Sequence, residues 1–168
     1  MSEHHVSIEW QRNTEGFKYE EYTRDHLWRF PGGSQIPASA APGYRGSEQF
    51  VDPEEALVAA ISSCHMLSLL AIASRKKLTI SRYEDNAVGF LEKNEDGMLA
   101  VTRVILRPKI IFETGVEVSD QDIQTLHDQA HHQCFIANSV KTEISVEAPP
   151  IKESVVSYSA SASQSNSR

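Results

Sequence analysis

The stretch Asp52–Ser74, DPEEALVAAISSCHMLSLLAIAS, decides how this chain folds. Asp52 is a good helix N-cap, and the proline and two glutamates that follow it suit a first helical turn with exposed N–H groups. The nineteen residues Ala56–Ser74 carry no formal charge, and the basic residues 75–77 follow them. Cationic side chains are favoured at a helix C-terminus. The stretch therefore predicts one long helix.

The absence of charge from this helix raises the question of a membrane span, because about twenty apolar residues can cross a bilayer. However, the run contains four serines, five alanines, a histidine and a cysteine, which insert poorly. We instead expect a helix that is apolar nearly all round and is buried on most sides. Since 168 residues provide few elements to cover it, packing against the same helix of a second subunit is our hypothesis. This predicts a homodimer and no membrane.

Length and charge limit the possible classes of protein. We expect residues 1–150 to form a single domain and the Ser-rich residues 151–168 to be a disordered tail. The net charge of −7 disfavours binding to nucleic acid or anionic lipid. The N-terminus shows no secretory signal, so we expect a cytoplasmic protein. There, two cysteines are reduced, metal-bound or redox-active more often than they form a permanent bridge.

Before the helix, alternation of apolar and polar residues predicts short strands. His4–Arg12 and Phe17–Tyr22 alternate on either side of NTEG, which favours a hairpin, and Arg24–Phe30 predicts a third strand. The stretch Ser34–Val51 is rich in Pro, Gly, Ser and Ala and predicts a long loop.

After the helix, two long strand-like runs, Leu78–Lys93 and Met98–Glu113, are joined by NEDG, a strong hairpin signal. Ser119–Phe135 predicts a second helix with a weak capping box, and Thr142–Ala148 a last strand. This order of elements indicates an α+β fold with mostly antiparallel pairing.

The two cysteines, Cys64 and Cys134, are the candidates for chemistry. Each could be a small buried hydrophobe, which is the usual role of a cysteine in an apolar helix. Alternatively, one thiolate attacks a peroxide and becomes a sulfenic acid, and the second thiol condenses with it to a disulfide. Cys64 is about three turns from the helix N-terminus, too far for the helix dipole to activate it.

Glu54 raises a point of geometry. Ten helical residues place it about 15 Å from Cys64 along the axis, so the two cannot touch within one helix. If two copies of the helix pack antiparallel across a two-fold axis, Glu54 of one subunit comes near Cys64 of the other. Otherwise Glu54 only stabilises the first turn.

Three segments together resemble the OsmC/Ohr family of thiol-dependent peroxidases. Asp52–Leu67 resembles its "(N/D)PEE…AA…(A/S)C" helix, Gly97–Ile110 its long strand after the hairpin, and Leu126–Val140 its second cysteine segment. The resemblance covers roughly Val6–Glu147. The chain departs from the family pattern at the residue after Cys64, which is histidine, and in the CFIAN that begins at residue 134.

The resemblance implies an intertwined dimer with antiparallel sheets around central helices and active sites at the interface. It implies that Cys64 is the peroxidatic cysteine, that Cys134 resolves it, and that Glu54 orients an arginine. In OsmC-type members that arginine precedes the helix, which indicates Arg45 as first choice. In Ohr-type members it lies near the N-terminal hairpin, which favours Arg24, our second choice, or Arg12.

The same resemblance implies reduction of organic hydroperoxides, with an external thiol or lipoyl-type dithiol as reductant and no bound cofactor or metal. Two alternatives stay open. His65, His131 and His132 beside the cysteines could form a zinc site, although their spacing is unusual for zinc. The protein could also be a non-enzymatic dimer that binds a small molecule or lipid and whose cysteines only pack.

Overall fold

The structure, a computed structural model, describes residues 1–149, and the tail predicted at 151–168 lies outside the described residues. The chain divides into two compact units, Met1–Leu57 and Val58–Arg168. We refer to them as the N-terminal and C-terminal units. The boundary falls within the first long helix, so each unit includes a part of it.

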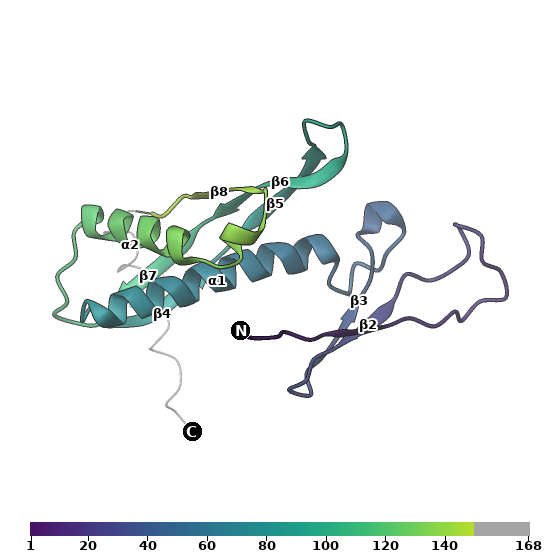
Figure 1. Cartoon of the computed structure of the whole chain (residues 1–168), viewed down its shortest axis with the longest axis horizontal. Helices are drawn as coiled ribbons and strands as arrows, with labels where there is room; N and C mark the ends of the chain where they lie inside the picture. The colour runs from purple at the N-terminus through teal and green to yellow at the C-terminus, as the bar shows by residue number, and fades with distance from the viewer. Residues whose placement is uncertain (150–168) are drawn as a thin grey trace, which may run out of the picture. The chain divides into compact units, whose positions relative to one another are not determined.

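The N-terminal unit is built on a three-stranded antiparallel sheet (Figure 1). Its strands, in spatial order, are β1 (Ser7–Glu9), β2 (His26–Arg29) and β3 (Gln35–Ala38). In the turn between β2 and β3, Gly33 has a φ of 86°, a left-handed conformation that glycine adopts without steric cost. A short 3₁₀ helix, η1 (Pro42–Tyr44), follows β3.

Two predictions for this unit are wrong. The hairpin predicted between His4–Arg12 and Phe17–Tyr22 does not form, because β1 pairs with β2 and the segment 17–22 is a series of turns. The Phe17 and Tyr22 rings lie 5.9 Å and 6.2 Å from the Trp10 ring, so the alternation reflects an aromatic cluster instead of a pleated strand. The predicted loop also contains β3, whose Pro37 is tolerated because β3 is an edge strand.

The long helix is confirmed as α1 (Pro53–Arg75). At its start, the Glu55 N–H donates to Asp52 Oδ1 at 2.7 Å and the Asp52 N–H donates to Glu55 Oε2 at 3.2 Å, a reciprocal capping box. At its end, Lys77 is left-handed with a φ of 60° and the N–H of Leu78 donates to the carbonyl of Ala73, as in a Schellman motif. Local sequence signals therefore set both ends of α1.

By length and composition, α1 is the one helix among the described residues that could cross a membrane, a test that the core helix of a globular protein also passes. Within the C-terminal unit, one face of α1 packs into a core with β7 (Pro108–Phe112) and α2 (Asp120–Gln133). The buried members of that core are Leu69, Ile72, Ala73, Ile110, Leu126 and Ala130. These contacts favour a core helix.

The two long strand runs of the C-terminal unit are each divided between two sheets. β4 (Ile80–Asp85) pairs antiparallel with β7, whereas β5 (Val88–Lys93), β6 (Leu99–Leu106) and β8 (Glu143–Val146) form a second sheet in the order β5-β6-β8. β5 and β6 are antiparallel and β6 and β8 are parallel. The predicted α+β fold with mostly antiparallel pairing is confirmed.

The division between the sheets occurs where Asp85 ends β4 and Arg107 links β6 to β7. There, the N–H of Arg107 donates to Asp85 Oδ1 at 2.7 Å. The predicted hairpin turn is confirmed at the other end of the two runs: the N–H of Asn94 donates to the Met98 carbonyl at 2.8 Å, and Gly97 has a φ of 75°. α2 opens with the predicted capping box of Ser119, and η2 (Ala137–Ser139) follows the helix.

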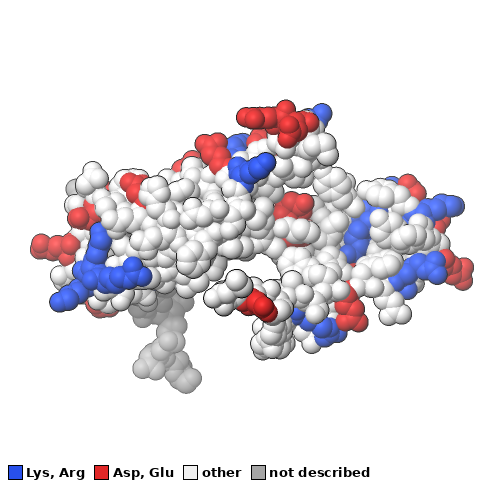
Figure 2. Space-filling view, in the orientation of Figure 1, with Lys and Arg blue, Asp and Glu red and all other residues white. Residues whose placement is uncertain are grey.

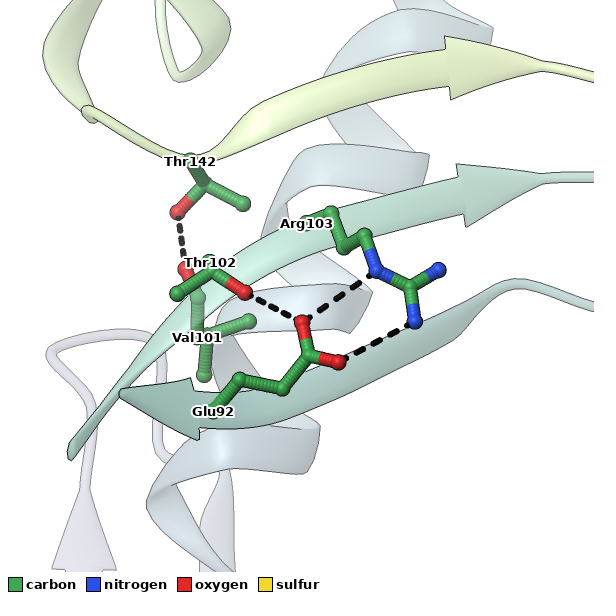
Figure 3. Close-up of polar contacts among 5 residues, drawn as sticks. All are labelled: Glu92, Val101, Thr102, Arg103 and Thr142. Atoms are coloured by element: carbon green, nitrogen blue, oxygen red, sulfur yellow. Dashed lines mark hydrogen bonds and ion pairs between the residues drawn. The ribbon is translucent and has the colours of Figure 1, made fainter. Parts of the chain in front are cut away.

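Side chains on the second sheet connect its strands (Figure 3). The Glu92 carboxylate accepts hydrogen bonds from the Thr102 hydroxyl at 2.7 Å and from two nitrogens of Arg103, each at 3.2 Å. The Thr142 hydroxyl donates to the carbonyl of Val101 at 2.8 Å. Since the ion pair is well exposed, it contributes little to stability, and its main effect is on the register of β5 and β6.

Candidate active site

The structure brings the two cysteines together. Cys64 lies half-buried on α1, and Cys134, 1% exposed, is the C-cap of α2; both are free thiols. Burial raises the pKa of the Cys134 thiol, and a hydrogen bond with the Cys64 side chain raises it further. Such a contact stabilises the protonated form of Cys134. The thiols of positions 64 and 134 of the sequence are therefore close enough to influence each other.

The turn after α2 holds the Cys134 thiol in place. The N–H of Ala137 donates to Cys134 Sγ at 3.3 Å. The Asn138 side chain donates to the carbonyls of Cys134 and His132, both at 3.1 Å. Ala137 and Asn138 were not predicted as site residues from the sequence, and both belong to η2. The chain therefore turns sharply at Cys134, and its thiol stays on the inner side.

A pair of buried histidines lies in the same unit. The rings of His65 and His127 stack with centroids 5.3 Å apart and an interplanar angle of 10°. His65 Nε2 and His127 Nδ1 are 3.0 Å apart. Burial lowers the pKa of each to about 4, and the neighbouring charges of His127 and His131 add to the effect at His65. Both imidazoles are therefore neutral near pH 7.

Sequence analysis named His65 only as a possible zinc ligand and did not consider His127. The signal that could have found His127 is its spacing: it precedes Cys134 by seven residues, so both lie on one face of α2. Within residues 1–149, no group of three or more His, Cys, Asp or Glu side chains is arranged to hold a metal ion. The His131 and His132 rings contact each other at 6.1 Å, and His132 is exposed.

The other candidate residues belong to the N-terminal unit. The Arg24 guanidinium lies 4.6 Å from the centroid of the Tyr19 ring and 4.0 Å from that of Tyr22, and it donates hydrogen bonds to the backbone carbonyls of both tyrosines. The Arg45 guanidinium is 5.9 Å from the Tyr19 centroid. Both candidate arginines thus face the same aromatic ring, in a region where sequence analysis singled out no aromatic residue.

The remaining two candidates of this unit are less distinctive in their surroundings. Arg12 donates a hydrogen bond to the carbonyl of Glu15 at 3.2 Å. Glu54 is half-buried in the first turn of α1. Since Glu54 and the arginines lie in one unit and the cysteines in the other, their predicted roles beside Cys64 stay predictions.

An open pocket of about 430 Å³ lies within the N-terminal unit and is lined mainly by apolar and aromatic side chains. Arg24 and Pro53, the residue before Glu54, are among its lining residues. Ile8, Trp10, Phe17 and Tyr22 provide much of its apolar surface. The pocket can hold an apolar group beside a guanidinium.

Residues 46–148, including both cysteines, match the family of OsmC-like proteins. The chain belongs to the OsmC/Ohr family. The family resemblance predicted from the sequence is therefore confirmed. No match was found among curated proteins.

Solved structures of OsmC-like proteins share the fold. An OsmC-like protein of unknown function from Vibrio cholerae O1 biovar eltor is 46% identical, with a TM-score of 0.85 over 89% of this chain and 100% of that one. The organic hydroperoxide resistance protein OsmC of Legionella pneumophila is 15% identical, with a TM-score of 0.64 over 88% of this chain and 96% of that one. The organic hydroperoxide resistance protein OhrB of Bacillus subtilis is also 15% identical, with a TM-score of 0.62 over 88% of this chain and 98% of that one.

Proposed function

We propose that this OsmC-like protein is a thiol-dependent peroxidase that reduces organic hydroperoxides. The observation that carries the proposal is the contact between Cys64 and Cys134, two reduced thiols far apart in the sequence. Their environments differ in the way that a two-cysteine cycle requires. Cys64 is partly accessible and can meet a substrate, whereas Cys134 is buried and its pKa is raised, so it stays protonated.

The proposed cycle has two steps. The Cys64 thiolate attacks the distal oxygen of ROOH, the O–O bond breaks, and the products are a Cys64 sulfenic acid and, after protonation of the leaving alkoxide, the alcohol ROH. The Cys134 sulfur then attacks the Cys64 sulfenic sulfur, forming an S–S bond and releasing water. In total, ROOH and two thiols give ROH, H₂O and a disulfide. An external dithiol or lipoyl-type reductant restores the thiols by exchange, and a reducing compartment such as the cytoplasm suits this step.

The proposal includes a homodimer. On α1, the positions Ala60, Ser63, Leu67 and Ala71 form one exposed stripe without charge, and Leu67 is 60% exposed. Figure 2 shows a broad area without charged side chains over the α1 and α2 region of the C-terminal unit. A second copy of α1 packed on this stripe would cover it, and an antiparallel arrangement would bring Glu54 of the partner subunit towards Cys64.

We propose that Arg24 completes the site and that Arg45 supports it. Arg24 lines the apolar pocket and has aromatic rings on its guanidinium, whereas Arg45 is exposed. In the pocket, aromatic side chains would receive the organic group of the substrate while Arg24 polarises the peroxide oxygen. This arrangement favours organic hydroperoxides over hydrogen peroxide, which has no apolar group to bury.

The test is a titration of the reduced protein with cumene hydroperoxide, followed by counting free thiols. We expect one equivalent of peroxide to remove both thiols and form an intramolecular disulfide. Cys64→Ser should abolish turnover, by at least about 10³-fold as expected for loss of a nucleophile. Cys134→Ser should allow one reduction of peroxide and stop at the sulfenic acid.

The contrary outcomes are equally clear. Full multiple turnover in either cysteine variant would refute the two-cysteine cycle. If both thiols stay unchanged at excess peroxide, the alternative of a dimeric protein that binds a small molecule or lipid would be favoured. Stoichiometric zinc in the purified protein, lost in both cysteine variants, would favour the metal site instead.

A further inference from the structure

The buried histidine pair connects the two helices that carry the cysteines. His65 is the neighbour of Cys64 on α1, and His127 lies two turns before Cys134 on α2. His65 Nε2 and His127 Nδ1 are 3.0 Å apart. Among the described residues, this is the one hydrogen bond that joins a side chain within α1 to a side chain within α2. Cys134 is not counted here, because it is the C-cap of α2. The thiol contact and the imidazole contact are therefore two separate points of attachment.

Two points of attachment constrain a pair of helices more than one does. A single contact leaves α2 free to rotate about it, whereas a second contact seven residues away, about 10 Å along the helix, removes that rotation. The core residue Ala130 lies on the same buried face of α2 between these two points, and Leu126 lies just before His127. Together with this packing, the imidazole contact therefore restricts how the Cys134 thiol is presented to Cys64.

No other described group forms a hydrogen bond with the His127 ring in place of His65. His65 is 1% and His127 2% exposed, so water does not replace the bond. His127 Nε2 is buried and has no hydrogen-bond partner among residues 1–149. The bond to His65 is therefore the only one shown for the His127 ring in the described part of the chain, and losing it would leave both nitrogens of a buried ring unsatisfied.

We propose that His65 and His127 are positioning residues that hold the Cys134 thiol against Cys64 and so favour formation of the disulfide. The effect is on the equilibrium and rate of S–S bond formation and not on the attack of Cys64 on peroxide. The inference rests on the proposed function for its biological role. Its physical content, a raised effective concentration of the two thiols, can be measured without peroxide.

The experiment is a thiol–disulfide equilibrium of the full chain with glutathione. In this reaction the two protein thiols reduce one oxidised glutathione to two reduced glutathiones and form the Cys64–Cys134 disulfide. Removing the hydrogen bond while keeping an aromatic ring, with His65→Phe or His127→Phe, should lower the effective concentration about tenfold, which raises the reduction potential by about 30 mV. The double variant should lose no more than either single one.

Conservative variants separate positioning from folding. The side-chain amide of glutamine lies about where imidazole Nε2 would be, and that of asparagine about where Nδ1 would be. Compared with the Phe variants, His65→Gln and His127→Asn should therefore each retain most of the effective concentration. His132→Phe, at an exposed position of the same helix, is the control and should leave the potential unchanged. If the Phe variants do not fold, His65→Asn replaces them, because its amide is too short to reach His127. Its potential is then compared with those of His65→Gln and His127→Asn.

The outcomes distinguish this inference from the proposed function. An unchanged potential in both Phe variants, additive losses in the double variant, or an equal loss in His132→Phe would overturn the positioning role, even if the protein reduces peroxide. A purely structural role would destabilise the reduced and oxidised proteins alike and leave the potential unchanged. Conversely, a shifted potential in the Phe variants, together with a wild-type protein that does not react with peroxide, would refute the proposed peroxidase function and support the positioning role of His65 and His127.

Discussion

The N-terminal and C-terminal units differ in where their large apolar side chains lie. In the C-terminal unit, α1, β7 and α2 share a buried core. Among the described residues 1–57 of the N-terminal unit, Ala38 is the one buried apolar residue. Many large apolar side chains of this unit are exposed: Val6, Ile8, Trp10, Phe17, Tyr19, Phe30, Ile36 and Tyr44.

The N-terminal unit therefore lacks a sizeable apolar core of its own. Burial of apolar surface is the main favourable term in folding, and a small unit that leaves most of its aromatic side chains in water lacks it. Exposed apolar surface of this extent marks an interaction site. In the proposed dimer, this surface and the exposed stripe of α1 would be covered together, and the following predictions test that.

The largest effect is expected from a charge on the exposed stripe of α1. Leu67→Glu would bury an unpaired carboxylate in the dimer, at a cost of about 3–5 kcal/mol. We expect the protein to become monomeric at micromolar concentration, measured by sedimentation equilibrium, and to lose peroxidase activity.

The matched control is Leu99→Glu at the hairpin, because Leu99 is 56% exposed and Leu67 60%. The control should keep the mass of the dimer. A wild-type chain that sediments as a monomer, or two variants that dissociate alike, would contradict the proposed interface.

The next effect concerns the core of the C-terminal unit. Leu126 of α2 is fully buried in the core shared with α1 and β7, so Leu126→Ala should lower the free energy of unfolding by about 3 kcal/mol in urea titrations. Met98→Ala, at a site 67% exposed, should change it by less than about 0.5 kcal/mol.

Ile8→Ala tests whether a partner covers the apolar surface of the N-terminal unit. Ile8 is 58% exposed in the single chain, so on its own it would behave like Met98. We expect a cost above about 1 kcal/mol that decreases on dilution, because a partner covers it. A cost near zero at all concentrations would show that the N-terminal unit stays uncovered.

Acid should destabilise the C-terminal unit through the histidine pair. Burial lowers the pKa of His65 and His127 to about 4; His131 adds to this at His65, while Asp85 opposes it there and Asp128 opposes it at His127. The pKa of a histidine in the unfolded chain is near 6.5, so between pH 6.5 and 4 the unfolded chain binds more protons than the folded one. Stability is therefore full above pH 6.5 and falls as the pH drops towards 4, by on the order of 2 kcal/mol per histidine at pH 5.

The check is a series of urea titrations between pH 7 and 5, under reducing conditions. The double variant His65→Gln with His127→Asn has no titrating groups at these positions and should show a much flatter dependence. A wild-type slope equal to that of the double variant would mean that the pair is not buried and neutral in the folded protein.

Local features of this fold could be predicted from the sequence. The cap at Asp52, the box at Ser119 and the hairpin turn at Gly97 each depend on residues within a few positions, and all three are confirmed. The division of the two long strand runs could not be predicted, because the bond from Arg107 to Asp85 joins residues 22 positions apart. The prediction of a strand at residues 17–22 was wrong because an aromatic cluster produces the same alternation of apolar and polar residues as a strand.

The candidate site shows the same limit. The contact of Cys64 with Cys134 was implied by the family resemblance and not by spacing, because nothing local relates positions 64 and 134. The partner of His65 could not be found, since a hydrogen bond across 62 positions requires the tertiary packing of α1 on α2. The resemblance ranked Arg45 before Arg24, and the sequence did not indicate that Arg24 lines an apolar pocket.

The smallest effect is expected at the start of α2. The Ser119 hydroxyl accepts a hydrogen bond from the Asp122 N–H at 3.2 Å, and the Asp122 carboxylate accepts one from the Ser119 N–H at 3.0 Å. Ser119→Ala removes the first of these and should lower the free energy of unfolding by about 1 kcal/mol. Ser74→Ala, an exposed serine inside α1, is the matched control and should be neutral or slightly stabilising, because alanine is the better helix former.

A second measurement separates loss of the cap from a general loosening of the helix. Hydrogen bonds from the side chain and backbone of Ser119 hold the pKa of Asp122 below its ordinary value, so NMR titration of Ser119→Ala should show that pKa rising towards the ordinary one. Loss of stability without this rise would mean that the capping box does not form in solution. Because α2 carries Cys134 at its opposite end, the same variant should leave the Cys64–Cys134 potential unchanged, in contrast to variants of the histidine pair.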